Sequence, residues 1–194
     1  MSHIIFDYIT TLMSPHQRIL DCGCGQGELL KQLVTQKNAI AYGIDNNSNN
    51  IEACLNKGLS VYHGDIGEGL KELPDNSFDV VVLSSTLQQI ESPAEIINHM
   101  IRVAPKVLVT FPNFAYWKCR LSLVRGIIPQ TKALPFTWYN TPNIRVISIK
   151  SFKKLCKELQ VNIVHQSNFV NDKKINSFGM SNLLAESALF LIET

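Results

Sequence analysis

The stretch RILDCGCGQG, residues 18–27, decides the fold class of this chain of 194 residues. Its first half, Arg18–Cys22, is an apolar run of strand length, and it leads directly into three glycines spaced G-x-G-x-G. A helical pattern then begins at Glu28. A strand, a glycine-rich turn and a helix in this order open the ligand-binding half of many α/β sheets, because glycine allows a tight turn and a close approach of ligand to backbone. The spacing differs from the G-x-G-x-x-G that binds dinucleotides.

Short apolar runs alternate with helical patterns outward from this stretch as far as residue 112. Such near-continuous apolar runs are typical of strands buried on both faces of a parallel sheet. Expected strands are 18–22, 40–45, 59–63, 78–83, 107–111, 161–165 and 188–192, with helices that include 28–36, 50–57 and 149–159. The pattern predicts one α/β domain over residues 1–194, with a doubly wound, mostly parallel seven-stranded sheet and helices on both faces.

Two acidic residues stand at the ends of predicted strands. Asp45 closes the second strand and Asp65 follows the third. Ligands of doubly wound sheets bind outside the carboxyl ends of the strands, where the strand order reverses. A carboxylate at the end of the second strand can accept both hydroxyl groups of a ribose. The alternative to a ligand site is purely structural. In that case the glycine loop only packs a strand against a helix, and the two carboxylates are only exposed to solvent.

Loop and acids together resemble the class I S-adenosylmethionine-dependent methyltransferases. The resemblance implies a Rossmann-like fold and S-adenosylmethionine, or S-adenosylhomocysteine as product, in the crevice. It implies that Gly23, Gly25 and Gly27 approach the amino-acid moiety, that Asp45 holds the ribose and that Asp65 reaches the adenine amine. Asp21 would orient the methionine end, and Ser84 and Leu87 would line the pocket.

A more specific resemblance extends over about the whole chain. The segments SFDVVVLS at residues 77–84, FPNF at 111–114 and TKALPFTWYNTPNI at 131–144 are similar to the MetW family of methionine-biosynthesis proteins. This similarity implies a role in methionine biosynthesis beside homoserine O-acyltransferase as a partner. The alternative is a small-molecule methyltransferase with an unidentified, anionic acceptor. The residues fit both alternatives, with and without transfer of a methyl group.

The α/β pattern is interrupted by an insertion at about residues 113–149. Seven of the 16 aromatic residues, including both tryptophans, lie between residues 111 and 139. They could form a lid over an acceptor, fill a small satellite core, or form a surface for a protein partner. Candidate residues for contact with a substrate or partner are Asn113, Tyr116, Trp117, Arg120, Lys132, Trp138 and Tyr139.

The net charge of +2 conceals an uneven distribution. No acidic residue lies between Glu95 and Glu158, whereas that interval holds 11 basic residues. The rest of the chain has 7 basic and 16 acidic residues. A basic, aromatic-rich segment beside the cofactor crevice favours an anionic acceptor or an acidic partner surface.

Several classes of function are not expected. Catalytic residues are unknown, because no carboxylate or Cys–His pair stands out as a general base. The sequence after the fourth strand, Leu83-Ser84-Ser85-Thr86, lacks the Asp/Asn-Pro-Pro-aromatic motif of amino-directed nucleic-acid methyltransferases, so nucleic acid is not an expected partner. Cys22 and Cys24 are spaced poorly for zinc, and no metal is expected. Without a signal-peptide pattern or a membrane-length apolar run, we expect a cytoplasmic protein with no membrane partner.

Overall fold

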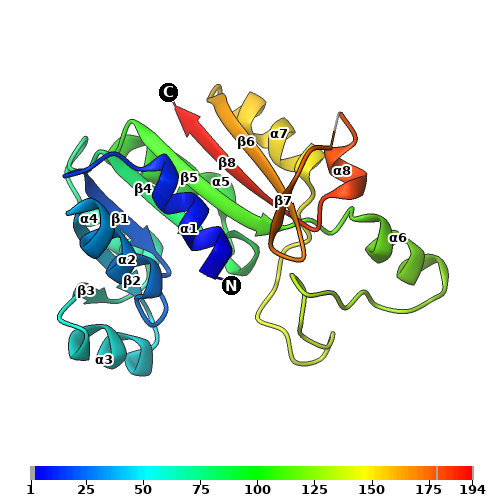
Figure 1. Ribbon diagram of the computed structural model, residues 1–194, viewed down its shortest axis with the longest axis horizontal. Helices are drawn as coiled ribbons and strands as arrows, with labels where there is room; N and C mark the ends of the chain where they lie inside the picture. Colours follow the sequence, from blue (N-terminus) through cyan, green and yellow to red (C-terminus); the bar gives the residue numbers. More distant parts are fainter. Residues whose placement is uncertain (1–2, 178, 194) are drawn as a thin grey trace.

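A central sheet runs through the molecule with helices packed on both of its faces, as Figure 1 shows for this computed structural model. The structure describes residues 3–177 and 179–193. In chain order the elements are α1 (His3–Leu12), β1 (Arg18–Cys22), α2 (Glu28–Lys37), β2 (Ile40–Asp45), α3 (Ser48–Asn56), β3 (Ser60–His63), α4 (Ile66–Glu72), β4 (Val80–Ser84), the 3-10 helix η1 (Leu87–Gln89), α5 (Pro93–Val103), β5 (Lys106–Pro112), α6 (Trp117–Val124), α7 (Ile149–Glu158), β6 (Asn162–Val170), β7 (Lys173–Ile175), α8 (Ser181–Leu184) and β8 (Ser187–Glu193). None of the helices in the described part of the chain is long and apolar enough to cross a membrane.

The strand order is β3-β2-β1-β4-β5-β8-β6-β7. The first five strands in this order are parallel, and β8 pairs antiparallel with both β5 and β6. The predicted doubly wound, mostly parallel sheet is therefore confirmed. Its strand order reverses between β1 and β4, because β1 lies between β2 and β4, and this is where such sheets bind ligands.

Over residues 3–177 and 179–193 the sheet has eight strands, one more than the predicted seven. The additional strand β7 pairs with the end of β6. Asn171 and Asp172 connect the two strands with positive φ angles of 48° and 66°, as a type I′ hairpin turn requires. With two lysines in its three residues, β7 has no apolar alternation that a sequence pattern could reveal.

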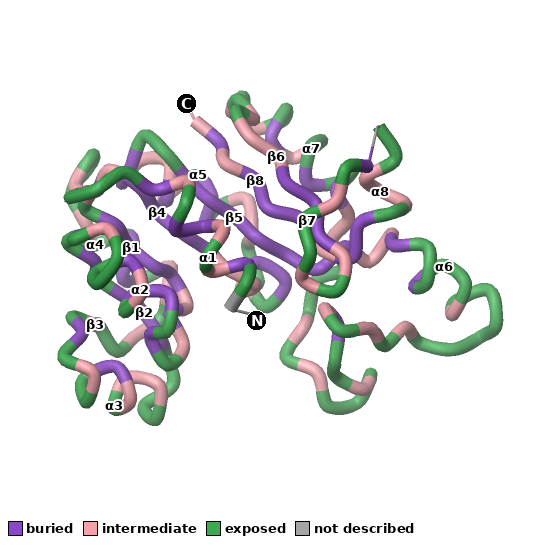
Figure 2. The backbone as a smooth tube through the Cα atoms, viewed as in Figure 1, coloured by how far each residue is buried: buried purple, intermediate pink, exposed green. Residues whose placement is uncertain are grey.

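Each face of the sheet has its own apolar core. On one face, α1 and α2 bury Ile9 and Leu33 against sheet residues that include Leu108. On the other face, α4, α5 and α7 pack over the rings of Phe111 and Phe190, which stack at 5.8 Å between centroids. Purple backbone in Figure 2 follows the sheet, whereas the insertion is largely green. The two cores fix the sheet's carboxyl edge, where the candidate site lies.

Helix α1 was not anticipated from the sequence. Ile5, Ile9 and Met13 recur every four residues, and all three are buried on the face of the sheet that α1 covers. This spacing was a usable signal. The helix matters for function because Phe6, on its first turns, reaches a cavity at the sheet's carboxyl edge.

Candidate cofactor-binding site

The glycine loop between β1 and α2 has a conformation that only glycine adopts readily. Gly23, Gly25 and Gly27 have φ angles of +76°, +54° and +77°. A Cβ atom on Gly23 would lie 2.6 Å from the Thr86 hydroxyl, and one on Gly27 would lie 2.5 Å from a Leu59 methyl. A Cβ on Gly25 would meet nothing within 4 Å. Gly23 and Gly27 therefore allow close packing, whereas Gly25 faces open space.

Hydrogen bonds within the protein use the N–H groups of this loop. Gly23 and Cys24 both donate to the carbonyl of Ile44, at 2.7 and 3.1 Å. Gly25 donates to a carboxylate oxygen of Asp45 at 2.8 Å. Loops that cradle a pyrophosphate need such N–H groups to point at the ligand. The loop is therefore unsuited to the phosphate binding of a dinucleotide site.

A cavity of about 810 Å³ lies beside the loop, at the carboxyl ends of β1, β2 and β4. Of the sequence-predicted cofactor residues, five line it: Gly23, Gly25, Asp45, Asp65 and Ser84. Helices α1, α3, α4 and α5 and the segment after β4 complete its wall. The structure thus brings together residues from four separate loops, as the topology of the sheet predicts.

Asp45 connects the glycine loop to the start of α3. Its carboxylate accepts hydrogen bonds from Gly25 N at 2.8 Å, from Asn47 N at 2.9 Å and from the Asn50 side chain at 3.0 Å. Asp65 caps α4 by accepting from the backbone of Gly67 at 2.7 Å and Glu68 at 3.2 Å, both through the same oxygen. Two carboxylate oxygens offer about four acceptor sites, so both side chains retain capacity toward the cavity.

Asp21 is a buried carboxyl group behind the loop. Its side chain is 2% exposed, and its Oδ1 atom has no hydrogen-bond partner among the described residues. Burial, with the nearby negative charge of Asp45 as the smaller cause, raises the pKa of the Asp21 carboxyl to about 7. An unpartnered acceptor in this position suits a cationic donor from a ligand or from a water that the ligand orders.

The cavity wall is strongly acidic. Its acidic and basic lining residues are Glu28, Asp45, Asp65, Glu68, Lys71, Glu91 and Glu95. Lys71 is the one cation among these described residues, and its ammonium pairs with Glu95 at 3.1 Å. The wall therefore favours a cationic ligand and disfavours an anionic one. None of the basic residues of 96–157 is among the described lining residues, although the Arg145 guanidinium donates to the carbonyls of residues 90 and 91 in the cavity wall.

Three predicted cofactor residues lie outside the cavity lining. Asp21 and Gly27 stand behind the wall, and Leu87 is 1% exposed within the main core. The expectation that Leu87 lines the pocket is corrected, because η1 turns its side chain inward. Thr86, directly before η1, and Gln89, its last residue, line the cavity instead.

Two further residues of the cavity wall, Phe6 and Asn50, were not expected from the sequence. Phe6 had no local signal, because only the packing of α1 on the sheet brings it to the wall. Asn50 lies in the Asn-rich run directly after Asp45, and that run was a usable signal. The N-cap of α3 is Asn47, whose side chain accepts from the N–H groups of residues 49 and 50.

The candidate substrate or partner residues of the insertion fall into two groups. Asn113 and Tyr116 are buried, which corrects the expectation that they contact a substrate or partner. Tyr116 packs with Cys119 and Leu134 in a small satellite core. Lys132 pairs with Asp172 at 2.5 Å, and the Arg120 side chain donates to the carbonyl of Ala115 at 2.7 Å.

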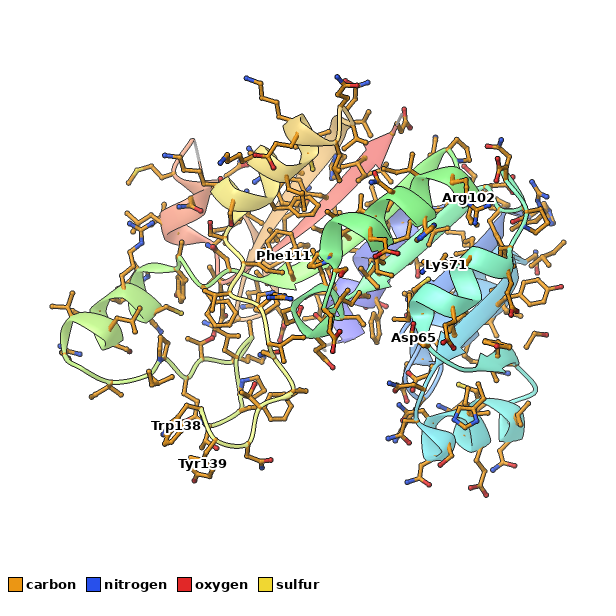
Figure 3. All side chains as sticks on the ribbon, turned by 180° about the vertical axis from the view of Figure 1, so that it is seen from behind. Asp65, Lys71, Arg102, Phe111, Trp138 and Tyr139 are labelled. Carbon is orange, nitrogen blue, oxygen red and sulfur yellow. The ribbon has the colours of Figure 1, made fainter. Side chains whose placement is uncertain are left out.

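Trp117, Trp138 and Tyr139 are exposed. None of the described cavity-lining residues comes from the insertion, so these rings do not form a lid over the cavity. Figure 3 shows Trp138 and Tyr139 at the tip of the insertion, well apart from Asp65.

Asn113 joins both ends of the insertion. Its amide donates to the carbonyls of Ala185 at 2.7 Å and Asn182 at 3.2 Å, and its oxygen accepts from Ala115 N at 3.1 Å and Ile149 N at 3.4 Å. We expect Asn113→Ala to lower the free energy of unfolding by about 2–4 kcal/mol, because buried backbone groups lose their partners. Urea unfolding measures this change.

The matched control for that prediction is Asn140→Ala, an exposed asparagine of the same insertion whose side chain makes no hydrogen bond among the described contacts. It should unfold like the wild type. Equal stability of the Asn113 variant and the control would show that Asn113 does not hold the insertion.

This combination of sheet order, glycine loop and acids at strand ends is that of the class I S-adenosylmethionine-dependent methyltransferase fold. A methyltransferase of this class from Archaeoglobus fulgidus superimposes with a TM-score of 0.71 and 17% identity, covering 97% of this chain and 94% of that one. Phosphoethanolamine N-methyltransferase 2 from Haemonchus contortus was solved in complex with S-adenosyl-L-methionine. It superimposes with a TM-score of 0.71 and 15% identity, covering 98% of this chain and 51% of that one. At these identities the likeness establishes the fold.

The family model described as "Methionine biosynthesis protein MetW" matches residues 4–192, and the chain belongs to this family. It is 34% identical over 153 residues to the "Bifunctional methionine biosynthesis protein MetXA/MetW" of Rhodopirellula baltica. That match covers 74% of this chain and 25% of the relative. The chain spans between a quarter and two fifths of the length of the curated relatives it matches.

Proposed function

We propose that this chain binds S-adenosylmethionine in the acidic cavity and acts in methionine biosynthesis together with homoserine O-acyltransferase. The first part rests on the charge of the cavity wall. Six carboxylates line it, and only two of them are in ion pairs, Glu95 with Lys71 at 3.1 Å and Glu28 with Lys57 at 3.3 Å. S-adenosylmethionine bears a sulfonium and an ammonium against a single carboxylate, so it enters as a cation. Membership of the MetW family supports the role in methionine biosynthesis.

Individual residues suit distinct parts of that ligand. Asp45 has spare acceptor capacity for ribose hydroxyls, and the second oxygen of Asp65 accepts no hydrogen bond from the described residues, which leaves it for an adenine amine. Gly25 leaves space for the ligand beside the backbone. Asp21, buried behind the loop and unpartnered at Oδ1, suits the ammonium end through an ordered water. When bound, the ligand would supply an electrophilic methyl group on sulfur.

A relative supports the acyltransferase as partner. The Rhodopirellula protein carries two designations in one chain, MetW and MetXA, and we take MetXA as the homoserine O-acyltransferase. Our chain matches a quarter of that protein. Two activities fused in one relative commonly correspond to separate chains that act together in another. The partner is therefore proposed from this fusion and from the family.

Methyl transfer to an anionic acceptor is the second candidate, and the cavity does not favour it. A negatively charged acceptor would face Glu91 and Glu95 without a free cation among the described lining residues. Cys24 lines the cavity, but burial raises the pKa of its thiol far above neutrality, so it is a poor methyl acceptor. Incubation with a metabolite pool, followed by a search for S-adenosylhomocysteine, tests this candidate.

Calorimetric titration with S-adenosylmethionine and S-adenosylhomocysteine tests the proposed cofactor. We expect both ligands to bind. At low salt the cationic S-adenosylmethionine should bind about tenfold more tightly than S-adenosylhomocysteine, a difference in binding free energy of about 1.4 kcal/mol. The difference should shrink as salt screens the exposed carboxylates. Asp65→Asn should weaken binding, while Asp75→Asn, which lies outside the cavity lining, should not. No binding of either ligand would refute the cofactor proposal.

A further inference from the structure

The insertion is rich in large apolar side chains that are exposed to solvent. Eleven of the twenty large apolar side chains that are exposed in the described chain lie within residues 117–146. Helix α6 buries only Cys119 among its eight residues, and Val124 at its end is 85% exposed. Trp138 and Tyr139 are 71% and 73% exposed. Exposed apolar clusters of this kind commonly mark protein interaction sites.

Polar contacts hold the insertion in place on the body of the domain. Lys132 pairs with Asp172 at 2.5 Å, and the carboxylate of Glu186 accepts from Ala133 N at 3.2 Å. On the return path, the Arg145 guanidinium donates to the carbonyls of residues 90 and 91 in the cavity wall. The apolar side chains are therefore presented on an anchored segment. A preorganised surface loses less entropy on binding than a mobile one.

The charge of this surface defines what it can bind. Lys118 and Arg125 are exposed, and neither side chain has a carboxylate partner among the described residues. Lys118 lies over the ring of Trp117, at 5.6 Å from its centroid. No acidic residue occurs from 96 to 157. A complementary partner surface is therefore apolar and carries aspartate or glutamate opposite Lys118 and Arg125.

We propose that two exposed parts of the insertion, together called the docking face, bind an apolar, acidic surface of homoserine O-acyltransferase. One part is on and next to α6, with Trp117, Lys118, Val124 and Arg125, and the other is the loop with Trp138 and Tyr139. This inference rests on the proposed function, which supplies the partner, and it adds where that partner binds. A second copy of this chain fits less well, because a two-fold contact through the same face would bring basic side chains together in a segment that lacks acids. The cofactor cavity stays accessible, since the insertion does not contribute to its described lining.

The apolar part of the docking face is tested with the double variant Trp138→Ala, Tyr139→Ala in the full chain. Its affinity for the purified acyltransferase, measured by calorimetry, should fall at least about a hundredfold, because aromatic anchors dominate such interfaces. The control is Leu55→Ser, an apolar residue on α3 that is 59% exposed. It should bind like the wild type, and both variants should retain S-adenosylmethionine binding.

The charged part is tested with Lys118→Glu, Arg125→Glu against Lys153→Glu, Lys157→Glu. Both pairs reverse two exposed charges of the same acid-free tract, but the second pair lies on α7. The first pair should weaken association about tenfold or more at low salt, with the difference shrinking at high salt. The second pair should leave the affinity within a factor of about two of wild type, since it lies outside the docking face.

Three results would overturn the inference. The first is an unchanged affinity of the Trp138/Tyr139 double variant for the acyltransferase. The second is that the control variants weaken this association as much as the docking-face variants do. The third is that, without the acyltransferase, sedimentation shows a wild-type homodimer that the Trp138/Tyr139 double variant converts to monomers. If the wild-type proteins associate but through another face, the docking face is wrong and the proposed function stands. If they do not associate at all, the partner in the proposed function fails too, whereas cofactor binding is judged separately by titration.

Discussion

Gly25→Ala is expected to bind S-adenosylmethionine about a hundredfold more weakly than the wild type, a loss of about 3 kcal/mol. Among the three loop glycines, Gly25 alone faces open space, and a methyl group there would occupy the space proposed for the ligand. The substitution meets no protein atom within 4 Å, so the variant should fold. Calorimetric titration gives the affinity, and circular dichroism checks the fold.

Gly58→Ala is the matched control for the strain of this substitution. Gly58 also has a positive φ, +71°, and a Cβ atom added there would meet nothing within 4 Å, but it lies away from the cavity. Both variants should lose about 1 kcal/mol of stability, because alanine is disfavoured in the left-handed region. Only Gly25→Ala should lose ligand affinity. Equal ligand binding by the two variants would show that the ligand does not approach the loop at Gly25.

Stability is expected to fall as pH rises from about 4 to 7 through the ionisation of Asp21. Burial raises the pKa of this carboxyl to about 7, whereas an unfolded chain ionises near 3.9. Between these values the folded protein keeps a proton that the unfolded chain has lost, so rising pH favours unfolding. The contribution is on the order of 4 kcal/mol. Asp21→Asn removes it, and urea unfolding across this pH range measures the slope.

Ligand binding should show the opposite dependence on pH. A cationic ligand near Asp21 favours the ionised carboxylate and lowers its pKa. Affinity for S-adenosylmethionine should therefore rise from pH 5 to pH 7 and level off above pH 7. Below pH 7, binding of the ligand should release a proton from Asp21. Asp21→Asn should bind more weakly at pH 8 and lose most of this dependence. An identical pH profile in wild type and variant would remove Asp21 from the ligand site.

The class of fold was accessible from the sequence because its signals are local. A strand, a G-x-G-x-G turn and a helix follow one another within residues 18–37, and near-continuous apolar runs indicated a parallel sheet with both faces covered. Asp45 and Asp65 were found because Asp45 ends a strand and Asp65 follows one after a single glycine. Strand β7 was missed because its pairing depends on a turn and not on apolar alternation.

The insertion was interpreted least accurately, for a physical reason. Aromatic composition alone cannot distinguish a lid, a satellite core and a partner surface, since all three use the same residue types. The structure divides them: Tyr116 packs in the satellite core, while Trp138 and Tyr139 project from the tip. Asn113 was proposed as a contact residue, yet its side chain is used entirely to join backbone segments.

The sequence by itself determined the parallel sheet, the glycine loop and the identity of the acids, since these follow from short-range pattern and from the rule that ligands bind at strand ends. Tertiary structure alone decided that the cavity is acidic and that the basic segment lies outside it. The 11 basic residues of the acid-free interval 96–157 had suggested an anionic ligand. Lys71 and Glu95, which come from different helices, meet only when α4 packs beside α5, and electrostatic potential depends on such distances in space and not on separation along the chain.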